Sequence, residues 1–422
     1  RTIAPSPGTQ GDQGAYLRYA REMFQTRYSV VGGRNRMPVY PFLLSLLYRP
    51  GLSEAEFLAR AQTFNVNLSA ALLLLLFAIY RRHFSAFYSL ALITGTAFGV
   101  FLNRSVFAQT ELLFYFISFC MFLSFWRMLV APTVWLALWS GAIAGIAHLT
   151  KASVLPALVA FAIAFALKIV GERRQLSGAR SGERWRRPIL LALVLASFLL
   201  VIFPYIQTSK RVFGRYFYNV NSTFYFWFDS SQEARAFSRT YRDRFGWPNL
   251  PPEQIPSASK YWREHSLAQI TGRLTHGLVE IATHNARLDG YYKYLFLLGL
   301  TATALLAWHW RAFPELWRAH FYPALFLVLF FGAYVLLYAW YVPLSADSRF
   351  LLSIFLPFTL AASKLIRRLS PAVISVGGKS VTTATALTAI LLFFAAIDAG
   401  HTALQLMNES SVRKTNAAAT GG

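Results

Sequence analysis

The stretch PILLALVLASFLLVIFPYIQT, residues 188–208, contains no charged side chain and is dominated by aliphatic and aromatic residues. A helix needs about 20 residues to cross the roughly 30 Å hydrocarbon layer of a bilayer, and one charged residue near its centre costs about 2.5 to 3.5 kcal/mol. The stretch therefore predicts a transmembrane helix. The runs that resemble it elsewhere in the chain decide the fold class.

Charge-poor runs of similar length recur along the chain and give ten predicted spans in all. The weakest is 350–364, between Arg349 and Lys364, which must rely on tilt, membrane thinning or a snorkelling lysine. We expect an all-α polytopic membrane protein with about ten transmembrane helices. The predicted spans are 63–80, 85–102, 111–126, 132–150, 152–168, 188–208, 292–310, 320–343, 350–364 and 380–397.

The overall composition excludes an ordinary soluble enzyme. Only 14% of the 422 residues are charged, against about 25% in a typical soluble domain. The 41 Lys and Arg outnumber the 18 Asp and Glu, which gives a net charge of +23. These basic residues are scattered between apolar runs, so we do not expect nucleic acid as a partner. Cys120 lies in an apolar run and is expected to pack there as a small hydrophobe.

The basic residues between the predicted spans alternate from one side of the membrane to the other. Every second loop is short, basic and nearly free of acidic residues, as cytoplasmic loops are under the positive-inside rule. We expect the remaining loops to face outward. The inner set contains Arg81, Arg82, Arg127, the stretch 172–187, Arg311, Arg318, Lys364, Arg367 and Arg368.

The same alternation divides the chain into five parts. We expect an outer juxtamembrane segment (1–60), transmembrane helices (61–208), an outer loop domain (209–290), further transmembrane helices (291–400) and an outer tail (401–422). Because residue 1 then lies outside, we expect a first transmembrane helix before this sequence, with a cleaved signal peptide as the alternative. Within the first part, residues 16–24 have the amphipathic pattern of a helix on the membrane surface, and 38–48 is apolar but too short to span.

Two acidic residues on the outer side are candidates for chemistry. Asp12 precedes the first surface helix, where it is equally suited to cap that helix and to act as a catalytic carboxylate. Glu111 lies at the outer mouth of a predicted span, where a carboxylate needs a partner or water, and Arg104 is a candidate partner.

Three cations, Arg36, Lys151 and Arg349, fall at the same outer membrane face. Snorkelling to lipid phosphates is one explanation for them, and Asp347 offers Arg349 an ion pair. Positive charge on this face nevertheless opposes the positive-inside bias. A cluster there favours an anionic ligand such as a lipid-linked phosphate.

Aromatic residues are dense from Phe213 to Phe228, at the start of the outer loop domain. They form either a platform on which sugar rings stack or, as the commoner arrangement, an aromatic belt at the bilayer surface. The sequence leaves both interpretations open.

In their order along the chain, these motifs resemble the GT-C class of membrane glycosyltransferases. The branch is the one that contains protein O-mannosyltransferases and lipid A aminoarabinose transferases. The resemblance covers most of the chain and rests on the order and common sidedness of short motifs. They are Asp12 with Tyr16, Tyr19 and Ala20; Arg36-Met37-Pro38 with the aromatic Tyr40 after it; Thr110-Glu111 before an apolar span; Leu149-Thr150-Lys151 with Pro156; and Arg349 before a terminal span.

The resemblance implies a bundle of about a dozen spans in a bacterial inner membrane, with a site that faces the periplasm. Its activity would be transfer of a sugar from a polyprenyl-phosphate donor to a hydroxyl of a lipid, glycan or protein, with inversion of the anomeric carbon. The site residues would be Asp12 as general base, Arg36, Lys151 and Arg349 as ligands of the donor phosphate, and Glu111, Tyr16 and Tyr40 in support.

The resemblance also bears on cofactors and on rival functions. No cofactor is expected to be required, although a divalent cation near Glu111 stays an alternative. Relatives frequently carry a second acid after the first Asp, and Gln13 at that position opposes a metal-binding carboxylate pair. The main rival is a transporter or flippase of an anionic lipid or solute, in which the same outer cations form a binding vestibule and Asp12 or Glu111 carries protons. A transporter would also need polar residues in mid-span; most spans here are uninterrupted, and Asn65 and Asn67 are the clearest exceptions. A lipid-linked-oligosaccharide polymerase or ligase is a second enzyme alternative.

Overall fold

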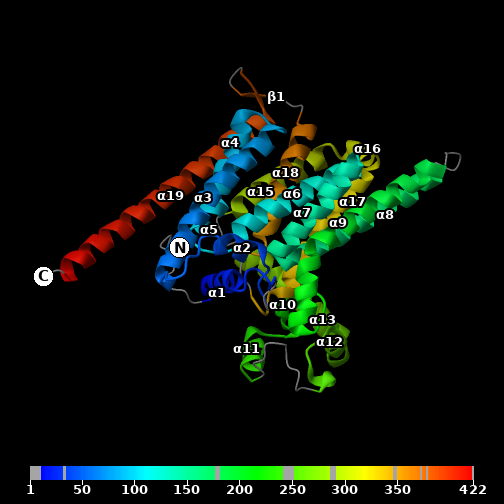
Figure 1. Cartoon of the computed structure of the whole chain (residues 1–422). Coiled ribbons are helices and arrows are strands. Elements are labelled where there is room, and N and C mark those ends of the chain that lie inside the picture. Colours follow the sequence, from blue (N-terminus) through cyan, green and yellow to red (C-terminus); the bar gives the residue numbers. More distant parts are fainter. Residues whose placement is uncertain are drawn as a thin grey trace.

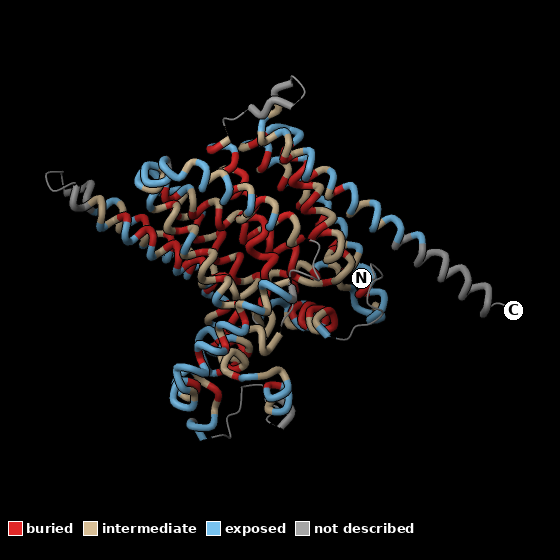
Figure 2. The backbone as a smooth tube through the Cα atoms, turned by 180° about the vertical axis from the view of Figure 1, so that it is seen from behind, coloured by how far each residue is buried: buried red, intermediate tan, exposed pale blue. Residues whose placement is uncertain are grey.

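The chain forms a bundle of long helices with a small helical lobe at one end (Figure 1). The computed structural model describes residues 11–31, 35–175, 181–240, 251–285, 291–345, 349–370, 373–376 and 379–420. Buried residues fill the centre of the bundle, and exposed residues cover its periphery and the lobe (Figure 2).

Each predicted span coincides with a helix of the bundle. The helices are α3 (Glu54–Arg81), α4 (Ala86–Thr96) continued by η1 (Ala97–Phe101) and α5 (Leu102–Ser105), α6 (Glu111–Val130), α7 (Val134–Thr150), α8 (Leu155–Gln175), α9 (Ser181–Phe213), α15 (Tyr292–Trp308), α17 (Phe321–Tyr341), α18 (Leu352–Leu369) and α19 (Thr383–Thr420).

Length and apolarity make the chain a multi-pass membrane protein. Within the described residues, seven helical segments are long and apolar enough to cross a membrane. They lie in α3, α4 to α5, α6, α8, α9, α17 and α19. Helices α7 and α15 are apolar but have only 17 residues each. Ten crossings therefore stay a prediction.

Helix α18 is short and carries Lys364, Arg367 and Arg368 in its second half, yet most of its residues are buried. Hydroxyl groups buried inside the bundle have no water to bond to, so they pair with one another. Two such pairs connect α18 to neighbouring helices. Tyr80 of α3 pairs with Thr359 at 2.8 Å, and Tyr88 of α4 donates to Ser363 at 2.9 Å. The weakest predicted span is therefore an interior helix.

The all-α prediction is confirmed, and one short hairpin accompanies the helices. Strands β1 (Val373–Val376) and β2 (Lys379–Thr382) form an antiparallel hairpin between α18 and α19, in which Val373 pairs with Thr382. The hairpin lies at the opposite end of the bundle from the lobe (Figure 1).

Two surface helices lie at the lobe end, α1 (Asp12–Gln25) and α2 (Val39–Ser45). The predicted amphipathic pattern of α1 is present, but its apolar face packs inward. Tyr16, Tyr19 and Met23 are buried, whereas Phe24 is exposed. This packing fixes the first turn of α1 against the end of the bundle.

The lobe contains α10 (Val220–Thr223), η3 (Tyr225–Trp227), α11 (Ser231–Thr240), η4 (Pro252–Gln254), α12 (Ala258–Glu264), α13 (Leu267–Glu280) and η5 (Ile281–Asn285). Helix α13 packs on the end of α17 at very close range. A Cβ atom on Gly277 would lie 2.0 Å from the carbonyl oxygen of Ala339. The helices η6 (Trp310–Ala312) and α16 (Phe313–Ala319) lie at the opposite end.

Helices α7 and α9 also approach closely, through Gly141 and Gly145 of α7. This spacing is the small-residue pattern that lets membrane helices pack backbone against backbone. A Cβ atom on Gly141 would lie 2.2 Å from the carbonyl oxygen of Val194, and one on Gly145 would lie 2.7 Å from Val201.

We expect Gly141→Ile to lower the free energy of unfolding by about 1 to 3 kcal/mol, the usual cost of overpacking. The control is Gly332→Ile on α17, because in the described part of the chain no atom lies within 4 Å of a Cβ added there. Unfolding in detergent, followed by circular dichroism, compares the two variants. Equal stability of both would contradict the packing argument.

Candidate functional site

A cavity of about 540 Å³ lies at the lobe end of the bundle. Its charged residues are the ones that the sequence placed on one membrane face, although they come from segments as distant as residues 12 and 349. Its lining includes Asp12, Tyr16, Arg36, Glu111, Lys151, Leu155, Pro156, Asn219, Asn221, Ser222, Phe226, Trp227, Leu337, Tyr341 and Arg349.

Asp12 is the first residue of α1, and its carboxylate faces two arginines. The N-cap position belongs to Gly11, whose φ of 72° suits glycine, and no side chain caps the helix. The prediction of Asp12 as the N-cap is therefore wrong. Its Oδ1 accepts a close hydrogen bond from Arg36, and its Oδ2 lies 2.7 Å from Nη1 of Arg349.

A second carboxylate extends this contact into a chain of alternating charges. Glu111 Oε1 lies 3.7 Å from Nη1 of Arg349 and 3.5 Å from Nζ of Lys151. Among the described residues, three cations and two carboxylates give the cluster a net charge of +1. The predicted ion pair with Asp347 lies outside the described residues, and Arg349 has Asp12 and Glu111 as its acidic partners here.

The cations also determine the ionisation of Asp12. Partial burial alone would raise the pKa of the Asp12 carboxyl, but the positive charges of Arg36, Arg349 and Lys151 outweigh it and lower the pKa. Asp12 is therefore ionised at neutral pH. Its ion pairs stabilise the fold above the unfolded-state pKa, and this stabilisation is lost as the pH falls through the lowered folded-state pKa.

Glu111 begins α6 and is almost fully buried, with 6% of its side chain exposed. Its Oε2 has no hydrogen-bond partner within the described residues. A buried carboxylate oxygen without a donor is costly, so Glu111 depends on its contacts through Oε1 with Arg349 and Lys151.

Lys151 directly follows α7 in an extended conformation, at the helix end where a positive charge is favourable. Its Nζ lies 5.5 Å from the ring centre of Phe114 and 5.0 Å from that of Phe350. Arg349 is held through its backbone, because Tyr115 donates a hydrogen bond to its carbonyl oxygen at 2.7 Å.

The two predicted supporting tyrosines differ in position. Tyr16 lines the cavity, and its ring centre lies 5.4 Å from Cζ of Arg36. Tyr40 is fully buried behind it, edge to face at 5.3 Å, and does not line the cavity. Tyr40 donates a hydrogen bond to Asn65 at 3.3 Å, which holds its ring in place. The ring then packs against Tyr16 and supports that residue without contacting the cavity.

Two polar residues flagged from the sequence hold the turn that precedes Glu111. Asn65 donates to the carbonyl oxygens of Ser105 and Phe107, at 3.2 and 2.7 Å. The buried Gln13, next to Asp12, accepts a hydrogen bond from the backbone N–H of Ala108 at 2.9 Å. These contacts couple the position of Asp12 to that of Glu111.

Sequence reasoning missed the part of the cavity wall that the lobe supplies. It consists of Asn219, Asn221, Ser222, Phe226 and Trp227, with Tyr341 from the end of α17. The dense aromatic stretch was the available signal, but nothing local to it shows which of its rings face a cavity.

Among the described residues, no group of three or more His, Cys, Asp or Glu side chains is placed to hold a metal ion. Comparison of the chain with protein-family models, with curated proteins and with solved structures finds no match.

Proposed function

We propose that the chain is a membrane glycosyltransferase that moves a sugar from a polyprenyl-phosphate donor to an acceptor hydroxyl. One observation carries this proposal. A carboxylate lies within a cluster of three cations, in a cavity at one end of a multi-pass membrane bundle. Such a site offers a base for the acceptor proton and positive charge for a departing phosphate.

The donor fits the composition of the cavity wall. Arg36, Lys151 and Arg349 would bind the phosphate, since guanidinium groups donate paired hydrogen bonds to its oxygens and lysine adds a point charge. Leu155, Pro156 and Leu337 belong to the same lining and supply an apolar side for the lipid portion. A location at the end of the bundle, in a bacterial inner membrane with the cavity facing the periplasm, would bring a lipid-linked donor to these residues.

The reaction needs little more than these groups. The acceptor oxygen would attack the anomeric carbon on the face opposite the phosphate, and the bond between that carbon and the phosphate oxygen would break. Asp12 would take the acceptor proton, and the three cations would stabilise the charge left on polyprenyl phosphate. The anomeric configuration inverts. The chemistry balances without a redox partner or cofactor.

Arrival of the donor would also activate the base. In the resting protein Arg36 and Arg349 lower the pKa of Asp12, which makes it a weak base. A bound phosphate competes for the same two guanidinium groups. As they turn toward the phosphate, Asp12 loses part of its cationic stabilisation and its proton affinity rises.

We expect Asp12→Asn to reduce sugar transfer by about 10²- to 10⁴-fold, the usual contribution of a general base. The same variant should bind polyprenyl phosphate at least as tightly as the wild type, because loss of one carboxylate raises the net charge of the cluster. Transfer in proteoliposomes and equilibrium binding of the lipid measure the two effects separately.

The matched control is Glu22→Gln, which removes an exposed carboxylate from the same helix outside the cavity. It should leave transfer unchanged. Full transfer by Asp12→Asn would exclude Asp12 as the base. Movement of the lipid between leaflets without any sugar transfer would instead favour a flippase.

We expect Arg36→Ala to weaken donor binding by about tenfold to a hundredfold, as for loss of a charge-assisted hydrogen bond. The apparent affinity for the acceptor should change much less. The control is Arg18→Ala, which removes an exposed arginine from α1. Donor and acceptor titrations of the transfer rate provide the measurement, and an unchanged donor affinity in Arg36→Ala would contradict the assignment.

A further inference from the structure

The lobe contributes a second part of the cavity lining that carries no charge. Phe226 and Trp227 supply aromatic surface, Asn221 supplies an amide, and the Ser222 hydroxyl can accept a hydrogen bond while it donates to the carbonyl oxygen of Asn219 at 3.3 Å. Both rings are only partly buried. The proposed phosphate chemistry uses none of these residues, which leaves their aromatic and hydrogen-bonding groups for a second, uncharged ligand.

The aromatic pair is held in place from behind by Trp340 of α17. The indole Nε1 of Trp340 donates a hydrogen bond to the carbonyl oxygen of Phe226 at 2.9 Å. The rings of Phe226 and Trp340 stack with their centres 5.8 Å apart. Trp227 packs against Tyr261 and Trp340, each with a centre-to-centre distance of 6.1 Å.

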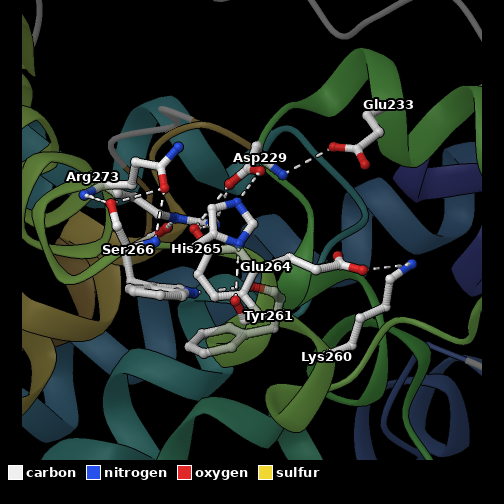
Figure 3. A network of polar contacts seen from close by, with 11 residues as sticks. Asp229, Glu233, Lys260, Tyr261, Glu264, His265, Ser266 and Arg273 are labelled. Atoms are coloured by element: carbon white, nitrogen blue, oxygen red, sulfur yellow. Dashed lines mark hydrogen bonds and ion pairs between the residues drawn. The ribbon is translucent and has the colours of Figure 1, made fainter. Parts of the chain in front are cut away.

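A polar network then fixes Trp340 and Tyr261 to each other. Figure 3 shows its members Asp229, Tyr261, His265 and Arg273. Arg273 donates to the carbonyl oxygen of Trp340 at 3.0 Å and to the hydroxyl of Tyr261 at 3.0 Å, and its Cζ lies 4.3 Å from the Trp340 ring centre. Asp229, two residues after Trp227, accepts from Arg273 at 3.2 Å and lies 2.8 Å from Nε2 of His265. The platform is therefore rigid before any ligand binds, which lowers the entropic cost of binding.

The other aromatic residues of the stretch have different surroundings. Phe213, Tyr218, Phe224 and Phe228 form the core of the lobe. Tyr216 has 63% of its surface exposed and does not line the cavity. The aromatic stretch thus combines a core, an exposed surface and a cavity wall.

We propose that Phe226 and Trp227, with Asn221 and Ser222, form an acceptor subsite that binds a saccharide ring. The apolar C–H face of a sugar packs on aromatic rings, while its hydroxyls need amide and hydroxyl partners. Among the described residues, those that the lobe contributes to the cavity wall are uncharged, which suits a neutral ring better than a peptide with ionic flanks. This inference rests on the proposed function, and it makes the acceptor a glycan or the sugar headgroup of a lipid.

The test uses the full chain in nanodiscs and saturation-transfer NMR with methyl glycosides of glucose, galactose and N-acetylglucosamine. We expect saturation of the ring protons of at least one glycoside in the wild type. Trp227→Ala should weaken this binding by roughly five- to tenfold. Trp227→Phe, which keeps an aromatic face, should retain most of it, and Tyr216→Ala is the matched control that should bind normally.

Correct folding of Trp227→Ala is checked by its binding of polyprenyl phosphate, which should equal that of the wild type. The subsite is excluded if no glycoside binds the wild type, or if Trp227→Ala and Tyr216→Ala bind equally well. Preferential binding of a serine-containing peptide, dependent on Trp227, would also overturn it in favour of a protein acceptor.

These outcomes are separable from those of the proposed function. Saccharide binding should persist in Asp12→Asn and Arg36→Ala, because neither residue belongs to the platform. Failure of Asp12 as the base therefore leaves the saccharide result standing. Failure of the glycosides leaves the phosphate and transfer measurements unaffected.

Discussion

The high free-energy cost of placing a charge in hydrocarbon determines where the ionisable side chains of this molecule lie. Ionisable side chains have to reach an end of the bundle or pair with one another, because the membrane interior offers no water to solvate them. Five ionisable residues lie at the lobe end and also pair with one another: Asp12, Arg36, Glu111, Lys151 and Arg349. Their ion pairs join α1, α6, the end of α7 and the start of α18. The contacts that relieve buried charge therefore also set the shape of the cavity.

Much of the fold was predictable because transmembrane helices leave a local signal in the sequence. Each apolar run became a helix, and the alternation of basic loops placed the charged candidates at one end of the bundle. Interior helix α18 gave the weakest signal, since its polar groups are satisfied by other helices, as in the pair between Tyr80 and Thr359. The hairpin and the docking of Gly277 on Ala339 depend on distant contacts that hydropathy does not contain.

The sequence predicted which charged residues form the site, but not how they are arranged. Sidedness grouped the five charged residues, yet only the folded chain shows that Gly11 takes the cap position and leaves the Asp12 carboxylate to the arginines. Polarity alone also misdirects. Asn65 is one of the polar mid-span residues that a transporter would need, whereas here its amide holds the turn before Glu111. The dense aromatic stretch offered a platform for sugar rings, but only the packing of the lobe against α17 shows that Trp227 is one of the rings that face the cavity.

The resting ion pairs of Asp12 present a physical problem that the proposed function resolves. A carboxylate between two arginines is stable but weakly basic, and each pKa unit corresponds to about 1.4 kcal/mol. A site that only bound phosphate would do better without a competing carboxylate. A site that also needs a base gains from the competition, because the incoming phosphate replaces Asp12 as the partner of the guanidinium groups. Under the proposed function, new ion pairs to the phosphate would offset the cost of separating Asp12 from its arginines. The base would then become strong only when a leaving group is present, which would disfavour proton abstraction from an acceptor that has no donor.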